Sequence, residues 1–255
     1  MHQKQENGLI RLNKALSRAG ICSRRRTEEL IRQGQIQVNQ EVVQDLGRKI
    51  DPCRDLVQLQ GQELQLASEQ LLQHLYLALH KPVRVVSTLQ DPQARTCIPD
   101  ILPAELKQRR LLPAGRLDYM SEGLLILSTD GELVQSLTHP SHQVSKTYRV
   151  LLRENVQHKQ LQIMRRGMRL KEGQVLAPVQ ASVVGPEPGQ GLWLELVLTQ
   201  GLNRQIRRMC RDLGLTVLRL IRTRQGPVQL GQLASGSTRP LNSKELAQLK
   251  GRQVP

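Results

Sequence analysis

Phenylalanine is absent from this chain of 255 residues, and aromatic residues make up only 2% of it. Proteins that hold single strands by stacking bases on many aromatic side chains need more rings than that. No apolar stretch approaches the ~18 residues needed to cross a bilayer. The N-terminal sequence MHQKQENGLI also lacks the apolar core of a secretion signal. We therefore expect a cytoplasmic protein without membrane segments.

Cysteine is scarce as well, and Cys22, Cys53, Cys97 and Cys210 are scattered along the chain. No C-x-x-C pair occurs, and no His–Cys spacing is typical of a zinc site. A P-loop and a G-x-G-x-x-G fingerprint are also missing. We therefore predict buried free thiols in a reducing compartment.

Acidic residues are the minority among the charges. The 22 Asp and Glu stand against 37 Lys and Arg, which gives a net charge of +15. Such an excess indicates a polyanionic partner, either a nucleic acid or an anionic membrane. The alternative is a solvated basic surface, on which the clustering of arginines would be accidental.

The chain opens with a compact unit, residues 9–67. Apolar residues at helical spacing predict a helix over residues 12–19 that ends at Gly20. Ser23 is a typical N-cap for a second helix. The alternating stretch IQVN then predicts a strand that ends in a turn.

The polar segment 68–74 is interpreted as a linker, and residues 75–251 as a second domain. The stretches YLALHKP, KTYRVLL (residues 146–152) and LWLELVL (residues 192–198) resemble strands. Proline and glycine punctuate the segments between them. Several strands with few helices predict an α+β fold with a largely antiparallel, mixed sheet flanked by helices.

Two helices carry clusters of arginine. In SRRRTEEL, Arg24–Arg26 occupy a first helical turn, where cations oppose the helix dipole at a cost of a few tenths of a kcal/mol each. Phosphates bound at that helix end would offset the cost, although such runs are equally often just solvated. In NRQIRRMCRDLG, a helix from Asn203 to Gly214 is expected, with an apolar face opposite four arginines.

The four arginines of the second helix repel one another at i,i+4 spacing. An ordinary amphipathic surface helix explains the period, but not why these outward positions carry arginine rather than mixed charges. An anionic partner or a nearby buried acid would offset the repulsion. Asp118, which precedes the apolar run Gly123–Leu127, is such an acid. A lone Asp most often caps a turn. If the strand that carries Tyr148 and the arginine helix meet it in one cleft, a carboxylate, a phenol ring and guanidinium groups converge.

Several of these motifs resemble one family. GRLDYMSEGLLILSTDGEL is similar to the signature of pseudouridine synthases of the ribosomal small-subunit/large-subunit (Rsu) branch. LALHKPVRVVST, HPSHQVSKTYRV and GLNRQIRRMCRDLG resemble three further motifs, in the family's order. RLNKALSRAGICSRRRTEELIRQGQIQVN resembles an S4 RNA-binding domain, so the resemblance covers nearly the whole chain.

The resemblance implies an isomerase that converts uridine within RNA to pseudouridine. The bond from N1 to C1′ breaks, the uracil turns, and C5 joins C1′, without a metal or a cofactor. The target nucleotide must first be flipped out of its stack. The resemblance favours 23S over 16S ribosomal RNA as the partner, and we expect a monomer that does not bind membranes.

The resemblance also assigns roles to single residues. Asp118 would attack C1′ or the base, or remove the 2′ proton, and the sequence leaves these three routes open. Tyr148 would stack on the flipped uracil. Arg207 would form an ion pair with Asp118, with Arg204 as the alternative. The basic residues expected to contact RNA are Arg24, Arg25, Arg26, Lys81, Arg116, Lys146, Arg204, Arg208 and Arg211.

Two positions depart from the family pattern. Arg84 replaces the usual glycine, and Ser121 replaces the usual threonine with its hydroxyl retained. The residues alone are also compatible with two other classes of protein. One is a non-catalytic RNA-binding or ribosome-assembly factor with an S4 domain. The other is a different RNA-acting enzyme built on such a domain, such as a methyltransferase or a synthetase.

Overall fold

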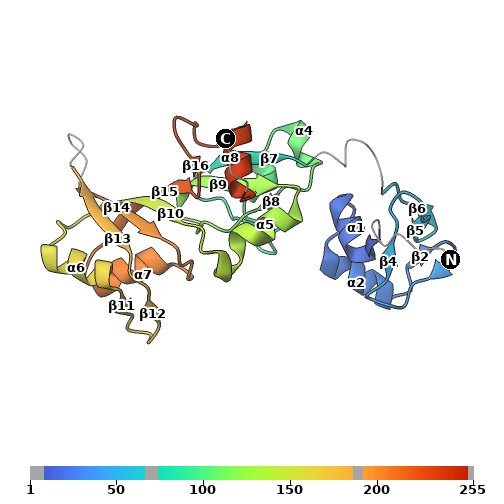
Figure 1. The fold of residues 1–255 in the computed structure, drawn as a ribbon, viewed down its shortest axis with the longest axis horizontal. Coiled ribbons are helices and arrows are strands. Elements are labelled where there is room, and N and C mark those ends of the chain that lie inside the picture. Colours follow the sequence, from blue (N-terminus) through green and yellow to red (C-terminus); the bar gives the residue numbers. More distant parts are fainter. Residues whose placement is uncertain (1–8, 67–73, 186–191, 252–255) are drawn as a thin grey trace. The chain divides into compact units, whose positions relative to one another are not determined.

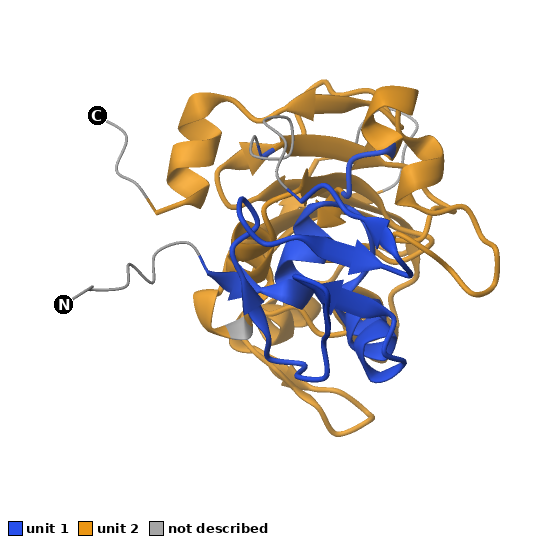
Figure 2. Cartoon of the chain, turned by 90° about the vertical axis from the view of Figure 1, so that its right-hand side faces the viewer, with its two compact units in different colours: residues 1–74, 108–110 blue, residues 75–107, 111–255 orange. Residues whose placement is uncertain are grey.

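The computed structural model describes residues 9–66, 74–185 and 192–251 of the chain. The chain divides into two compact units, one of residues 1–74 with 108–110 and one of residues 75–107 with 111–255 (Figure 2). The expected linker, residues 68–74, lies outside the described residues except for His74. All four cysteines are free thiols, as predicted. Cys97 and Cys210 are buried, Cys22 is half-buried and Cys53 is exposed, so the expectation of burial was wrong for Cys53 and only partly met by Cys22.

The first unit combines two helices with short strands (Figure 1). Strands β2, β3, β5 and β6 form one sheet in the order β3-β2-β5-β6, and β1 pairs with β4. The elements are β1 (Ile10–Arg11), α1 (Leu12–Arg18), α2 (Arg24–Arg32), β2 (Ile36–Val38), β3 (Glu41–Val42), β4 (Lys49–Ile50), β5 (Val57–Leu59) and β6 (Gln62–Glu63).

The local sequence signals in this unit are confirmed. Helix α1 stops before Gly20, whose φ of +76° suits a residue without a side chain. The hydroxyl of Ser23 accepts a hydrogen bond from the Arg26 amide at 3.0 Å and caps α2. The buried side of both helices packs on β2 and β5 in one apolar cluster that includes Leu16, Ile31 and Ile36.

The second unit is built on a nine-stranded sheet. Seven strands form the path β13-β14-β10-β15-β9-β7-β17, with β16 paired to β15 and β8 paired to β9. Its strands are β7 (Tyr76–Lys81), β8 (Leu112–Pro113), β9 (Glu122–Ser128), β10 (Lys146–Leu152), β13 (Gln180–Val184), β14 (Leu192–Leu198), β15 (Val217–Gln225), β16 (Val228–Gln229) and β17 (Thr238–Pro240), and β11 (Met168–Arg169) and β12 (Val175–Leu176) form a separate hairpin.

Helices cover this sheet at both ends. They are α4 (Ala104–Lys107), α5 (Gly131–Thr138), α6 (His158–Arg166), α7 (Gln205–Asp212) and α8 (Ser243–Leu249), with 3₁₀ turns at Ile98–Ile101 and Pro140–His142. Within the described ranges, β9 and β15 form the one parallel strand pair of the sheet, and the other pairs are antiparallel. The predicted α+β class with a largely antiparallel, mixed sheet is thereby confirmed. No helix in the described part of the chain is long and apolar enough to span a bilayer.

Helix α7 is shorter than the sequence predicts. It begins at Gln205 because Arg204 has a φ of +49°, and Asn203 does not cap it. Its apolar face is as expected. Ile206 and Met209 are buried in a cluster with α6 and with strands β10 and β14.

Glycine 123 fixes how β9 meets β15. Gly123 is paired with Arg222 in the parallel register and has a φ of +108°. A Cβ built there would lie 2.4 Å from the Arg222 carbonyl oxygen, well inside van der Waals contact. All seven residues of β9 are buried. The loop that ends at β9 is thus held close to β15, and the pocket described below opens at this junction.

Candidate active site

A pocket of about 190 Å³ opens where the two halves of the large sheet meet. Five parts of the second unit line it: the loop before β9, the end of helix α5, strand β10, the segment from the end of β14 into α7, and strand β15. The side chains used below are Arg116, Asp118, Lys146, Tyr148, Arg204, Arg207 and Arg222. One carboxylate and six side chains with basic or phenolic groups therefore share one concave surface.

Asp118 is half-buried at this pocket and is positioned by its backbone. Its carbonyl accepts a bond from the Ser121 amide at 3.0 Å. The preceding residue, Leu117, exchanges two bonds with the hydroxyl of Ser87, at 2.9 and 3.1 Å. The loop is therefore clamped on both sides of Asp118. Within the described ranges, the carboxylate itself makes no hydrogen bond or ion pair, so it remains available to a ligand.

Arg207 lies in the same pocket, but it does not pair with Asp118. Its guanidinium Nη2 donates to the carbonyl oxygen of Met120 at 2.7 Å and lies 3.4 Å from the hydroxyl of Ser121. The predicted ion pair is therefore not formed in this structure, in which Nη2 of the guanidinium bonds to the loop after Asp118 instead. The two charges still interact. Burial has the largest effect on the pKa of Arg207 and lowers it, the charge of Arg204 lowers it further, and the charge of Asp118 raises it.

Strand β10 contributes Lys146 and Tyr148, which point to the same side of the sheet because they are two residues apart. Tyr148 is half-buried and packs against the cluster below α7. Lys146 donates to the Val144 carbonyl at 2.9 Å. Burial, and then the nearby Arg222, lower the pKa of Lys146.

Arg222 is a pocket residue that the sequence analysis did not single out. Its side chain is 1% exposed on β15, and its Nε donates to the Leu124 carbonyl at 2.6 Å. A second nitrogen, Nη1, lies 3.4 Å from the carbonyl of Arg116, within the loop that carries Asp118. The sequence does carry a signal for its inward position. Arg222 stands two residues after Leu220, which is buried, and residues two apart on a strand point to the same face.

Lys81 is buried in this structure, whereas the sequence analysis expected it on the surface that contacts RNA. Its side chain is fully buried, and Nζ donates to the carbonyls of Pro82 at 2.6 Å and Val85 at 2.9 Å. Burial, and then Arg222, lower its pKa to about 8. Lys81 therefore fastens the loop after β7 from inside.

The low pKa of Lys81 predicts a specific pH dependence of stability. Above pH 8 the native state gives up this proton, while the unfolded chain keeps it up to about pH 10.4. Stability from this group therefore rises between pH 8 and 10. Relative to Lys81→Met, wild-type protein should gain about 1–3 kcal/mol of unfolding free energy over that range. Urea unfolding of both proteins at several pH values measures this, and a constant difference would contradict the assignment.

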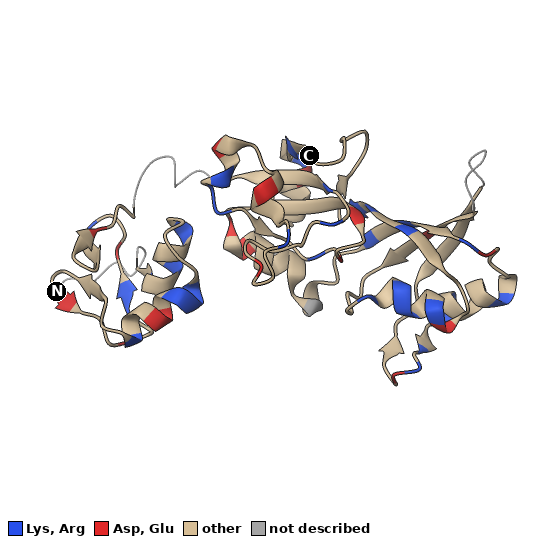
Figure 3. Ribbon diagram, turned by 180° about the vertical axis from the view of Figure 1, so that it is seen from behind, with Lys and Arg blue, Asp and Glu red and all other residues tan. Residues whose placement is uncertain are grey.

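The remaining predicted RNA-binding residues fall into two groups. Arg116 and Arg204 are exposed and line the pocket. Arg208 and Arg211 face the β11–β12 hairpin, where Arg208 donates to Gln174 and Arg211 pairs with Glu172, both at 2.5 Å. Figure 3 shows the Lys and Arg positions of the chain in blue. The arginines at positions 24–26 are exposed on α2 of the first unit.

The two departures from the family pattern also lie beside this pocket. Arg84 has a φ of +62°, in the left-handed region that favours glycine, and its amide donates to the Tyr119 carbonyl at 2.6 Å. The backbone at position 84 can therefore lie close to the Tyr119 carbonyl with an arginine in place of glycine, because the arginine side chain points into solvent. Ser121 is buried. In the described part of the chain, no three or more His, Cys, Asp or Glu side chains gather in a way that would hold a metal ion.

Comparisons with known proteins assign both units to families. The family model described as RNA pseudouridylate synthase matches residues 75–212, and the S4 domain model matches residues 10–56. A Mycobacterium tuberculosis protein, named an uncharacterized RNA pseudouridine synthase, is 39% identical over 94% of this chain and 92% of its own. The ribosomal large subunit pseudouridine synthase B of Bacillus subtilis is 34% identical over 94% of this chain and 95% of its own.

A solved structure agrees with these matches. A crystal structure described as a pseudouridylate synthase superposes with a TM-score of 0.67 and is 26% identical. The match covers 94% of this chain and 99% of that one. Both the sequence matches and this superposition extend over the two units of the chain.

Proposed function

Because the chain belongs to the RNA pseudouridylate synthase family, we propose that it isomerises one uridine of large-subunit (23S) ribosomal RNA with Asp118 as the essential group. The observation that carries this proposal is the lone carboxylate in a pocket of cations, without a partner among the described side chains. The preference for the large subunit rests on relatives that are named ribosomal large subunit pseudouridine synthase B. We place the reaction in the cytoplasm, with the protein as a monomer.

The reaction rearranges uridine without net loss or gain of atoms. The bond between N1 and C1′ breaks, C5 bonds to C1′, the proton on C5 leaves, and N1 gains a proton. No electrons are exchanged with another molecule, so the chemistry requires no redox cofactor. The protein must hold the detached uracil, turn it and move one proton.

Asp118 would supply the reactive group of this sequence. An ionised carboxylate serves either as a nucleophile toward C1′ or the base, or as a base toward the 2′ proton. Arg207 and Arg222 line the same pocket and would face the negative charge of the substrate. Since Arg207 already donates to the Met120 carbonyl, it also fixes the loop that carries the acid.

Tyr148 and the basic residues would hold the substrate. The ring of Tyr148 is half-buried on β10 and lines the pocket, where it would pack against a flipped pyrimidine. Its hydroxyl would accept or relay the C5 proton. Arg116 and Arg204 stand exposed at the pocket and would contact phosphates on either side of the flipped nucleotide. Arg24, Arg25 and Arg26 of the S4 domain would add phosphate contacts elsewhere on the RNA.

Mapping pseudouridines in ribosomal RNA from cells that lack the gene tests the proposed substrate. We expect the loss of one pseudouridine from the large-subunit RNA, with the small-subunit RNA unchanged. Purified protein should form the missing pseudouridine in large-subunit RNA isolated from the strain that lacks the gene. Loss of a small-subunit pseudouridine instead would contradict the choice of subunit. An unchanged map in both RNAs would contradict ribosomal RNA as the substrate.

A further inference from the structure

An exposed tyrosine lies directly beside Asp118. Tyr119 is 39% exposed, and the neighbouring apolar side chains Met120 and Val83 are 49% and 40% exposed. The other two tyrosines of the chain, Tyr76 and Tyr148, are half-buried. Large apolar side chains that remain in water beside a binding pocket mark a contact surface for a ligand or partner.

The backbone around Tyr119 is fixed from three directions. The amide of Arg84 donates to the Tyr119 carbonyl at 2.6 Å, and Arg207 donates to the Met120 carbonyl at 2.7 Å. On the other side, the Ser121 amide donates to the Asp118 carbonyl at 3.0 Å. The tyrosine is thus held in a constant relation to the acid, although it is not among the residues that line the pocket.

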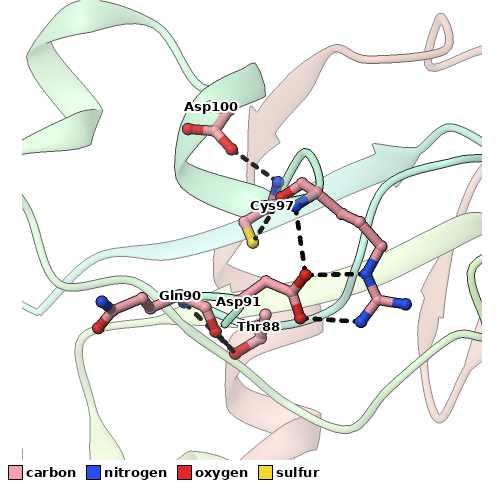
Figure 4. Close-up of polar contacts among 6 residues, drawn as sticks. Thr88, Gln90, Asp91, Cys97 and Asp100 are labelled. Carbon is pink, nitrogen blue, oxygen red and sulfur yellow. Dashed lines mark hydrogen bonds and ion pairs between the residues drawn. The ribbon is translucent and has the colours of Figure 1, made fainter. Parts of the chain in front are cut away.

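An arginine supports the tyrosine ring. The guanidinium carbon of Arg95 lies 5.9 Å from the ring centroid of Tyr119, within the range of a cation–π contact. Arg95 is itself oriented by Asp91, whose two oxygens accept its Nε and Nη2, both at 2.8 Å (Figure 4). The Asp91 side chain is 6% exposed, and its bonds to Arg95 lower the pKa of Asp91 to about 2. The pair therefore stays charged and aligned at neutral pH.

The segment that carries this pair is anchored at both ends. Val86 and Cys97 form a parallel bridge, and the Val86 amide donates to the Thr96 carbonyl at 2.9 Å. Asp100 accepts the Cys97 amide at 2.7 Å, and the hydroxyl of Thr88 donates to the Gln90 carbonyl at 2.9 Å (Figure 4). These bonds hold the loop that presents Arg95 beside the Tyr119 ring.

We propose that Tyr119, supported by Arg95 and Asp91, is a stacking platform for the nucleobase next to the flipped uridine. This inference rests on the proposed function, since it requires an RNA substrate whose target base enters the pocket of Asp118. Tyr119 lies outside the pocket lining, so the base that meets it is a neighbour of the target. Every base has a π-face, and stacking on a protein ring contributes about 1–3 kcal/mol per base. Tyr119 is therefore a positioning residue that holds the neighbouring nucleotide in register while the target uridine leaves the stack.

The test compares Tyr119→Leu with wild-type full-length protein on an RNA fragment that contains the mapped uridine. We expect kcat/KM for pseudouridine formation to fall roughly 5- to 100-fold, the range that corresponds to one lost stacking contact, with most of the change in KM. Tyr119→Phe and Tyr119→Trp, which keep a ring, should restore KM to near the wild-type value. Val183→Ala, which truncates an exposed apolar side chain on edge strand β13, serves as the matched control.

A second measurement separates stacking from a structural role. Fragments are prepared with an abasic site on the 5′ or the 3′ side of the uridine. On intact RNA the wild type should have a higher kcat/KM than Tyr119→Leu. On one of the two abasic fragments this difference in kcat/KM should disappear, because no base is left to stack on the ring. An equal penalty on intact RNA and on both abasic fragments would show a structural effect and overturn the proposal. Unchanged kinetics of Tyr119→Leu on intact RNA would also overturn the stacking proposal. If the wild-type protein were inactive on ribosomal RNA, that result would contradict the proposed function itself.

Discussion

Asp118→Asn is expected to abolish pseudouridine formation, with kcat reduced at least about 10³-fold, as loss of a catalytic acid–base or nucleophilic group does. The amide has nearly the shape of the carboxylate, so the clamped loop around it should persist. It carries no charge, and it neither attacks carbon nor accepts a proton at neutral pH. Release of the C5 proton from tritiated RNA measures the effect directly.

RNA affinity of Asp118→Asn should stay at the wild-type value or increase slightly. The proposed phosphate contacts come from arginines, and removal of one negative charge from a cationic pocket should not weaken them. Glu105→Gln removes an exposed acid from α4 by the same chemical change and serves as the control for activity. Near wild-type turnover by Asp118→Asn would show that another group performs the reaction.

Gly123→Ala is expected to destabilise the second unit by about 3 kcal/mol or more. The added methyl group would lie 2.4 Å from the Arg222 carbonyl oxygen and 2.6 Å from its amide nitrogen. Neither backbone atom is free to move, because β9 and β15 pair at this point. Overpacking costs of about 1–3 kcal/mol then add to about 1–2 kcal/mol of backbone strain at positive φ. Urea unfolding followed by circular dichroism measures the loss.

Gly173→Ala isolates the contribution of the clash. Gly173 also has a positive φ, +89°, but a Cβ there would meet no atom within 4 Å. The strain alone should therefore cost about 1–2 kcal/mol. If both substitutions were equally destabilising, the close approach of β9 to β15 would not be the reason that glycine is needed at position 123.

Local patterns in the sequence predicted the elements that surround the site. Strands β10 and β14 have the bounds of the stretches KTYRVLL and LWLELVL. Their alternation and their β-branched and apolar content are strong local signals, which tertiary contacts reinforced. The boundary of α7 was less predictable, because the left-handed conformation of Arg204 is set by the loop before it and not by the helix pattern.

Charged residues were the main source of error within the site. Lys81 was expected on the surface because lysine is almost never fully buried without partners. Two carbonyls of its own loop supply those partners, and no sequence period reveals them. Arg222 was overlooked for a related reason: its guanidinium bonds to a carbonyl of strand β9 and to one of the loop before it, and these contacts exist only once β15 is paired with β9.

The partner of Arg207 could not be read from the motif either. The motif places this arginine on the first turn of α7 and so into the pocket with Asp118. Which oxygen it meets depends on the conformation of the loop between Asp118 and β9, where the Met120 carbonyl points at the guanidinium. Sequence thus indicates which residues converge, whereas the individual bonds depend on how the loops close.

The most direct test of the central claim is a structure of the protein bound to an RNA fragment with 5-fluorouridine at the mapped position. Fluorine at C5 cannot leave as a proton, so the rearranged base should remain in place. We expect a flipped pyrimidine in the pocket, within about 3–3.5 Å of the Asp118 carboxylate, with the ring of Tyr148 against its face. Ordered RNA on the protein with the modified base stacked in its strand and the pocket empty would contradict it.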